Sequence, residues 1–244
     1  MSRFFTQQIE GNTARITGED VRHLSRVLRL RVGDAVELCD GACTDYTGRI
    51  EAITEQEVRC ALSGAHPSPT EPRCRVTLFQ ALPKTGKLEL IVQKCVELGV
   101  DTVVPVVTAR CVAVPVRDFE FKRVRYQRVA SEAAKQSRRG MIPQVASVRK
   151  LSEVSFSGFD AVLVAYEEER ARSLKAALRA FEPAALSRIA LVVGPEGGLE
   201  RAEVEGLSAA GAVAVSLGAR ILRTETAGMA MLAQVLYELD MADA

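Results

Sequence analysis

Residues 189–201 of the chain read IALVVGPEGGLER, an apolar run that ends in a turn rich in glycine. The run is typical of a strand buried on both faces, because such strands lack the alternation of apolar and polar residues. A helical pattern, ERAEVEGLSAA, follows at residues 200–210. Glycine turns between a strand and a helix bind phosphates in several α/β folds. A phosphate-binding loop is therefore the first interpretation to consider.

The P-loop motif does not match this turn. It requires G-x-x-x-x-G-K-[ST], so that backbone amides and the lysine contact phosphates while the hydroxyl contacts magnesium. No lysine follows GPEGG, residues 194–198. The single Gly-Lys pair of the chain, Gly86-Lys87, has Ala81 in place of the first glycine and Leu88 in place of the hydroxyl residue. The sequence therefore argues against a P-loop.

A dinucleotide-binding turn also fits poorly. Its G-x-G-x-x-G spacing differs from the spacing of Gly194, Gly197 and Gly198. Pro195 lacks the amide hydrogen that would bind a pyrophosphate. A tight turn in which glycine only supplies positive φ stays open as the simplest alternative.

A second loop favours a ligand site over a simple turn. LGARILRTETAG, residues 217–228, follows the next apolar run and again leads into a helical pattern. It places apolar Ile221 and Leu222 directly before the polar residues that start the helix. A pocket between this loop and GPEGG would bind an adenosine-like group through backbone hydrogen bonds between apolar walls.

Strands alternate with helices from about residue 75 onward. The predicted strands are RVTLFQAL (75–82), TVVPVV (102–107), FDAVLVAY (159–166), RIALVV (188–193) and AVAVSLG (212–218). The predicted helices are 85–99 with Gly99 as its C-cap, 118–139, 171–181, 200–210 and 224–239. This alternation predicts an α/β fold with a parallel sheet covered on both faces, whose ligands bind at the carboxyl ends of the strands.

The first 66 residues have a different pattern, of short apolar runs separated by turns. They predict a small antiparallel barrel or sandwich, interrupted by one helix in GEDVRHLSRVLRL (18–30) that buries Val21, Leu24, Val27 and Leu28. The proline-rich stretch AHPSPTEPRC (65–74) indicates a linker. We therefore expect two domains, at residues 1–70 and 74–244.

Composition narrows the class of protein. The 244 residues are 48% hydrophobic with a net charge of +1, values typical of a globular protein. There is no apolar run of membrane-spanning length and no signal-like N-terminal stretch, so we expect a cytoplasmic protein. The six cysteines lack the C-x2-C pairing of zinc ribbons, so we expect reduced thiols and no metal.

Positive charge is concentrated between Arg110 and Lys150, a stretch that contains eleven basic and three acidic residues. Such a stretch binds a polyanion or forms a solvated helix face, and composition alone does not separate the two.

Five motifs, in the same order along nearly the whole chain, resemble the 16S rRNA uracil-N3 methyltransferases of the RsmE type, within the SPOUT superfamily. They are VRHLSRVLRLRVGD (21–34), QKCVELGV (93–100), EAAKQSRR (132–139) with Pro143 beyond it, GPEGG (194–198) and LGARILRTETA (217–227). The resemblance implies an N-terminal PUA-like β-barrel that binds RNA. It also implies a C-terminal SPOUT domain with a parallel sheet and a trefoil knot, and a homodimer.

The resemblance further implies S-adenosyl-L-methionine as cofactor. Carried over to this sequence, the cofactor-binding residues are Tyr166, Val193, Gly194, Glu196, Gly197, Gly198, Leu217, Gly218, Ile221, Leu222 and Thr226. The role of Glu196 within the turn stays open: it either orders the turn or contacts a partner.

Methylation at uracil N3 requires an unpaired base and stabilisation of the charge that develops on O2 and O4. Arg223 and Arg139 are the candidate donors, and Glu225 is the candidate proton acceptor. Each assignment has an alternative that stays open. For Arg223 and Glu225, the alternative is that they pair with each other and cap the last helix. For Arg139, it is a contact with RNA instead of a catalytic role.

The expected partner is 16S rRNA or the small ribosomal subunit. The candidate RNA-binding residues are Arg22, Arg26, Arg29, Arg110, Arg123, Arg128 and Arg138. One competing hypothesis is a non-catalytic RNA-binding or ribosome assembly protein with the same fold. A second is a nucleotide hydrolase, which is weakened because the P-loop motif does not match.

Overall fold

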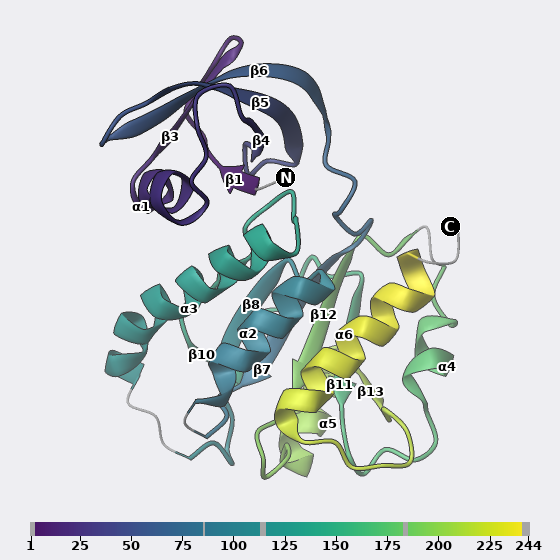
Figure 1. Cartoon of the computed structure of the whole chain (residues 1–244). Helices are drawn as coiled ribbons and strands as arrows, with labels where there is room; N and C mark the ends of the chain where they lie inside the picture. The colour runs from purple at the N-terminus through teal and green to yellow at the C-terminus, as the bar shows by residue number, and fades with distance from the viewer. Residues whose placement is uncertain (1–2, 85, 113–115, 183–184, 241–244) are drawn as a thin grey trace. The chain divides into compact units, whose positions relative to one another are not determined.

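A computed structural model describes residues 3–84, 86–112, 116–182 and 185–240. Its contacts divide the chain into two compact units (Figure 1). The N-terminal unit runs to Glu71 and also includes Ala134–Ile142. The C-terminal unit consists of Pro72–Ala133 and the chain from Pro143 onward. The predicted domain boundary lies at the same linker, but segment 134–142 was expected in the larger domain and packs with the smaller unit.

The N-terminal unit is built on one six-stranded sheet of order β1-β4-β5-β6-β3-β2. Its strands are β1 (Arg3–Phe5), β2 (Ile9–Glu10), β3 (Thr13–Thr17), β4 (Ala35–Cys39), β5 (Thr44–Ile53) and β6 (Glu57–Pro67). The β1–β4 pair is parallel and the other pairs are antiparallel. One face of the sheet buries the side chains of Phe4, Ile16, Leu38 and Ile50 in a shared core.

The helix of this unit differs from its prediction at Val27. A short α1 (Glu19–Arg22) continues into a π-helical turn, η1 (His23–Val27), in which the amide of Leu28 donates to the carbonyl of His23. Val21 and Leu24 are buried as expected, but Val27 is 67% exposed. The expectation that Val27 is buried is wrong because the wider turn places it off the apolar face that a 3.6-residue period predicts.

The C-terminal unit contains a parallel sheet of order β10-β8-β7-β12-β11-β13, with β9 paired to β8. Its strands are β7 (Arg75–Ala81), β8 (Thr102–Val107), β9 (Gln144–Val145), β10 (Arg149–Lys150), β11 (Ala161–Ala165), β12 (Arg188–Val193) and β13 (Val213–Val215). Every pairing is parallel. The predicted α/β fold with a parallel sheet is confirmed.

Helices cover both faces of this sheet. They are α2 (Lys87–Leu98), α3 (Val116–Gln136), α4 (Leu174–Leu178), α5 (Arg201–Ala209) and α6 (Thr224–Asp240), with a short 3-10 turn, η2 (Leu151–Glu153). Helices α2 and α6 lie side by side on one face (Figure 1). Gly228 of α6 packs against Leu78, whereas Val204 of α5 shares a core with Phe79. Since Leu78 and Phe79 are adjacent strand residues, the two helices cover opposite faces.

The apolar stripe of α2 is buried. The sequence prediction that Gly99 caps this helix is confirmed. Gly99 ends the helix with φ of 108°, a left-handed conformation that glycine adopts without strain. None of the described helices has both the length and the apolar character needed to cross a membrane. None of the six cysteines, all of which are described, forms a disulfide.

Candidate active site

A pocket of about 500 Å³ lies at the carboxyl edge of the parallel sheet. It is formed where β11, β12 and β13, three neighbouring strands, end and their loops begin. Ten of the expected cofactor-binding residues line it: Tyr166, Val193, Gly194, Glu196, Gly197, Gly198, Leu217, Gly218, Ile221 and Leu222. The two loops that the sequence analysis paired therefore face one cavity.

The glycine turn requires its glycines for both backbone conformation and space. The amide of Gly198 donates to the carbonyl of Pro195, which closes the turn. Gly198 has φ of 71°, and a Cβ there would lie 1.9 Å from Oε1 of Glu167. At Gly194 a Cβ would approach the backbone of Gly198 to 3.1 Å. Without side chains at these positions, the backbone itself forms one wall of the pocket.

The second loop forms the other wall. Gly218 has φ of 118° and turns the chain after β13. Leu217, Ile221 and Leu222 line the pocket beyond it. Ile221 is 80% exposed, which is unusual for a large apolar side chain and suits contact with a ligand or a partner.

Thr224 joins the two loops. Its hydroxyl donates to the carbonyl of Gly194 at 2.6 Å, and Nε2 of Gln80 donates to the same hydroxyl at 2.9 Å. Both side chains are buried. Thr226, which the sequence analysis assigned to the cofactor, is exposed and does not line the pocket. That assignment is corrected: because α6 begins at Thr224, Thr226 falls on the outer side of its first turn.

Sequence analysis missed Lys87, the first residue of α2. Its Nζ lies 3.1 Å from Oε1 of Glu196 and 3.2 Å from Oε2 of Glu225. The backbone amide of Lys84 also donates to Glu196, at 3.0 Å. Lys87 therefore links α2 to both loops and lines the pocket. In the sequence, this lysine belongs to the Gly86-Lys87 pair, which does not match the P-loop motif.

The two carboxyl groups beside Lys87 both have a lowered pKa. Burial raises the pKa of Glu196, but hydrogen bonds from the backbone amides of Glu196 and Lys84 and the Lys87 ammonium bring the pKa below its ordinary value. The amide of Glu225 at the start of α6 lowers the pKa of that carboxyl, with Lys87 adding to the effect. The ion pairs with both carboxylates raise the pKa of Lys87.

These pKa directions bear on the proton-acceptor role of Glu225. A carboxylate with a lowered pKa is a weaker base, so direct abstraction of a proton from N3 is disfavoured. Arg223 does line the pocket, and its side chain is exposed. The geometry thus places Arg223 on the pocket wall and Glu225 at the start of α6 in the Lys87 ion pair.

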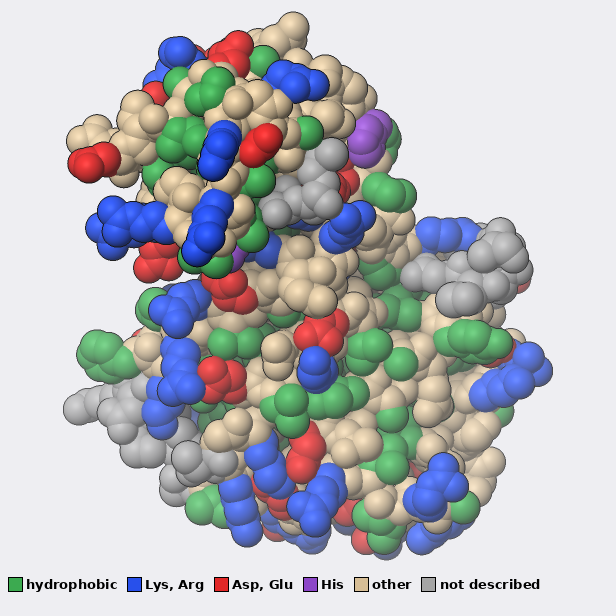
Figure 2. Space-filling view, viewed as in Figure 1, with side chains coloured by type: hydrophobic (Ala, Val, Ile, Leu, Met, Phe, Trp, Pro, Cys, Tyr) green, Lys and Arg blue, Asp and Glu red, His purple; other side chains and the backbone are tan. Residues whose placement is uncertain are grey.

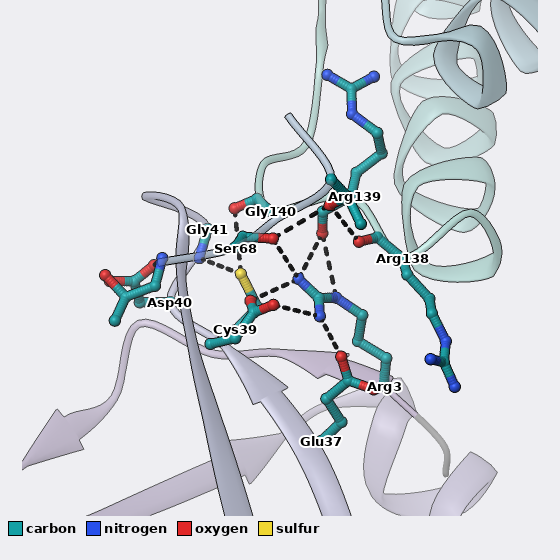
Figure 3. A network of polar contacts seen from close by, with 12 residues as sticks. Arg3, Glu37, Cys39, Asp40, Gly41, Ser68, Arg138, Arg139 and Gly140 are labelled. Carbon is teal, nitrogen blue, oxygen red and sulfur yellow. Dashed lines mark hydrogen bonds and ion pairs between the residues drawn. The ribbon is translucent and has the colours of Figure 1, made fainter. Parts of the chain in front are cut away.

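Arg139 lies in the N-terminal unit and does not line the pocket. Its guanidinium donates to both carboxylate oxygens of Glu71, at 2.8 and 2.6 Å, and Arg139 is 3% exposed. Its carbonyl accepts hydrogen bonds from the guanidinium of Arg3 (Figure 3). The expected catalytic role and the alternative RNA contact are both corrected, because an ion pair buries the charged group.

The Arg3 guanidinium is the centre of this network. It donates to both oxygens of Asp45, at 3.0 and 2.6 Å. It also donates to Glu37 (Figure 3). Gly140 completes the contact, since its amide donates to Glu71 at 2.7 Å. A Cβ at Gly140 would lie 2.5 Å from that of Ser68. The network therefore fixes segment 134–142 to the N-terminal sheet.

The candidate RNA-binding arginines differ in how free their side chains are. Arg22, Arg26, Arg29, Arg128 and Arg138 are exposed. Arg123 pairs with Glu120 within α3 at 2.7 Å. Arg110 donates to the carbonyl of Gly197 at 2.8 Å, so it also supports the glycine turn. Figure 2 shows basic side chains gathered over the α3 region on the face drawn.

Among the described residues, no group of three or more His, Cys, Asp or Glu side chains is arranged to hold a metal ion.

Two family models of RNA methyltransferase domains match the chain. A model of the RNA methyltransferase domain matches residues 70–236, which is more than half of the chain. A model of the RNA methyltransferase PUA domain matches residues 16–63.

The particular family follows from individual relatives. The chain is 35% identical over 251 residues to ribosomal RNA small subunit methyltransferase E of Bacillus subtilis, covering 99% of this chain and 98% of the relative. It is 36% identical over 241 residues to the protein of the same name from Mycobacterium tuberculosis, covering 92% and 86%. The chain belongs to the ribosomal RNA small subunit methyltransferase E family.

Solved structures agree with this assignment. The crystal structure of a ribosomal RNA small subunit methyltransferase E from Neisseria gonorrhoeae, bound to S-adenosyl methionine, aligns with a TM-score of 0.82 at 29% identity and covers 96% of each chain. A methyltransferase from Legionella pneumophila, with the bound cofactor SAM, also aligns with a TM-score of 0.82, at 27% identity and covering 97% of this chain and 96% of that one.

Proposed function

We propose that this chain transfers a methyl group from S-adenosyl-L-methionine to N3 of a uridine in 16S rRNA of the small ribosomal subunit. The observation that carries the proposal is the convergence of GPEGG and LGARILRTETA on one pocket. Relatives that span the whole chain carry the small-subunit rRNA methyltransferase name, and one solved relative binds S-adenosyl methionine. Uridine N3 as the target rests on the resemblance of the five motifs.

The residues of the pocket fit this cofactor. Its volume of about 500 Å³ lies within the range typical of sites for small molecules. Gly194 and Gly198 leave backbone exposed on one wall, and Leu217, Ile221 and Leu222 provide an apolar wall for an adenine. S-adenosylmethionine, when bound, supplies a methyl group on a positively charged sulfur. Tyr166 and Glu167 at the end of β11 complete the enclosure.

The protein's own contribution is to hold the base and stabilise its charge. The target uracil must leave its base pair before N3 is accessible. As the N3 proton passes to water, negative charge spreads to O2 and O4, and Arg223 on the pocket wall is the donor we assign to that charge. The ion pairs of Lys87 with Glu196 and Glu225 hold the two loops in fixed positions. The methyl group and N3 can then meet in line.

The fold has finer features that we also propose. After β13 at the edge of the sheet, the chain returns to the middle, where α6 packs on β7 and β12. This return supports a trefoil knot, with Thr224 bonded to Gly194 at the crossing. We propose a PUA-like barrel for the N-terminal unit. Residues 1–70 and 74–244 are the two proposed domains, except that segment 134–142 packs with the smaller one.

We further propose that the chain forms a homodimer and acts in the cytoplasm, where small subunits assemble. Exposed apolar side chains at Ile221, 80% exposed, and Tyr237, 67% exposed, support a partner surface near the pocket and along α6. Arg22, Arg26, Arg29, Arg128 and Arg138, all exposed, are the side chains that we assign to rRNA phosphates.

The test is methylation of small subunits, and of naked 16S rRNA, prepared from cells that lack this chain. Each is incubated with S-adenosylmethionine labelled at the methyl group, digested and separated as nucleosides. We expect label in N3-methyluridine from at least one of the two substrates. Label in a different nucleoside, or no label from either substrate, contradicts the proposal.

A further inference from the structure

A second pocket lies at the opposite edge of the C-terminal sheet, where the strands begin. It has a volume of about 600 Å³ and is lined by the first residues of β7, β8 and β12 and by side chains of the segment 146–159. Three of its lining residues are arginines, Arg75, Arg149 and Arg188. We name it the amino-edge pocket. The methylation chemistry uses none of these residues.

Two of the arginines form a pair of like charges. Arg75 and Arg188 are register partners at the first positions of β7 and β12. Partners in adjacent strands project from the same face of a sheet, and like charges directly opposite each other destabilise it. Compensation is weak: the nearest carboxylate oxygen of Asp101 lies 3.9 Å from Nε of Arg75, whose side chain is 76% exposed. A bound anion would relieve this repulsion.

An aromatic ring lies beside the arginines. The guanidinium of Arg188 is 5.2 Å from the ring centroid of Phe159, which packs edge-on against Phe79 at 5.8 Å. Gly158, with φ of 86°, brings the loop close, since a Cβ there would lie 3.4 Å from Nη1 of Arg188. Guanidinium groups beside a half-buried ring can bind a phosphate and stack a base together.

The net charge around the pocket limits the ligand. The basic side chains are Arg75, Arg149, Lys150 and Arg188, and the acidic ones are Asp101, Glu153 and Asp160. Lys150 pairs with Glu153 at 3.1 Å, and the Asp160 carboxylate accepts from the backbone amides of Ser187 and Arg188. The excess is a single positive charge. That balance suits the monoanionic phosphodiester of an RNA chain better than the several charges of a free nucleoside triphosphate.

We propose that the amino-edge pocket binds one unpaired nucleotide of the RNA substrate, away from the uridine that is methylated. Arg75 and Arg149 contact the phosphodiester, and Phe159, backed by Arg188, stacks with the base. The inference rests on the proposed function, because it takes RNA as the substrate. It adds a contact on the opposite edge of the sheet from the cofactor pocket, which extends the RNA footprint across the C-terminal unit.

The test compares the full-length R75Q/R149Q variant with wild type and with R179Q. Arg179, the residue that follows α4, is a matched control, because its exposed side chain pairs with Glu238 of α6 at 2.7 Å and lies outside the pocket. Binding of a labelled 16S rRNA fragment is measured at several salt concentrations, with melting temperature and S-adenosylmethionine affinity recorded for each protein. We expect about tenfold weaker RNA binding and a salt slope reduced by about 1.4, two phosphate contacts at about 0.7 each. R179Q is expected to match wild type.

A second variant, F159L, keeps an apolar side chain but removes the stacking surface. We expect it to weaken binding of unpaired RNA about tenfold without changing the salt slope, because stacking contributes roughly 1–3 kcal/mol per base. Wild-type RNA affinity and salt slope in R75Q/R149Q would overturn the proposal. Competition by uridine monophosphate as effective as competition by an RNA oligonucleotide would also overturn it, in favour of a free-nucleotide site. Failure of methylation alone, with RNA binding still weakened by these variants, would contradict only the proposed function.

Discussion

The hydroxyl of Thr224 donates a 2.6 Å hydrogen bond to the carbonyl of Gly194, thirty residues earlier in the chain. Thr224 starts α6, directly after one pocket loop. Gly194 starts the glycine turn that forms the other loop. The same hydroxyl accepts from Gln80 on β7. One buried side chain therefore ties two loops to the sheet, and the shape of the pocket depends on it.

Replacement of Thr224 by valine keeps the shape of the side chain and removes its hydroxyl. We expect the free energy of unfolding to fall by about 1–3 kcal/mol, because the buried Gly194 carbonyl loses the Thr224 donor and Gln80 loses one of its two acceptors. Urea unfolding measures the change, and calorimetry measures the affinity for S-adenosylmethionine, which we expect to fall as well. T226V, at an exposed position outside the pocket lining, is the matched control and should leave both unchanged.

Replacement of Gly198 by alanine imposes a left-handed conformation on a residue with a Cβ. This costs about 1–2 kcal/mol, and the Glu167 carboxylate must also leave its place beside the turn. We expect a lower melting temperature and S-adenosylmethionine binding weakened about tenfold. G206A, within α5 where a Cβ meets nothing within 4 Å, should instead raise stability by about 1 kcal/mol. Equal behaviour of the two variants would contradict the assigned role of the turn.

The Lys87 ion pairs predict a pH dependence. Because the folded-state pKa values of Glu196 and Glu225 lie below their ordinary values, the stabilisation from these groups is complete above about pH 4.3 and is lost as the pH falls through the folded values. K87M removes part of that stabilisation, so its unfolding free energy should fall less than that of wild type between pH 7 and pH 3. The control is K94M, which removes a surface pair with Glu97.

The Arg139 ion pair predicts a structural phenotype. E71Q leaves the Arg139 guanidinium buried without its carboxylate, and we expect a loss of about 3–5 kcal/mol in stability. At a temperature where the variant is folded, kcat should match wild type, because Arg139 does not line the pocket. E153Q, which removes an exposed pair with Lys150, should change stability by less than about 1 kcal/mol. A large fall in kcat for folded E71Q would return Arg139 to the mechanism.

Sequence periodicity predicted the parallel sheet and the two pocket loops because apolar runs and glycine turns are local signals. It could not predict Lys87 in the pocket, since that position depends on α2 starting beside two loops more than a hundred residues away. Thr226 was chosen over Thr224 because the sequence does not say which residue of a helix start faces inward. Val27 was misplaced because a π-helical turn has no periodic signature.

Arg139 was misassigned for a further reason. A basic residue in a basic stretch suggests solvent and nucleic acid, and only the folded chain shows the Glu71 carboxylate that pairs with it. Likewise, the parallel partnership of β1 with β4 joins residues 34 apart and leaves no local pattern.

Segment 134–142 has a consequence for the way this protein can be divided. The chain passes from one unit to the other at residue 71, returns at residue 134 and leaves again at residue 143. A single cut in the linker would therefore not release an intact N-terminal half, because the fragment would lose the backbone that Arg3 and Glu71 bind. The two units are interlaced in sequence. They should fold and unfold as partners, and exchange of either unit between related proteins would have to carry this nine-residue segment along.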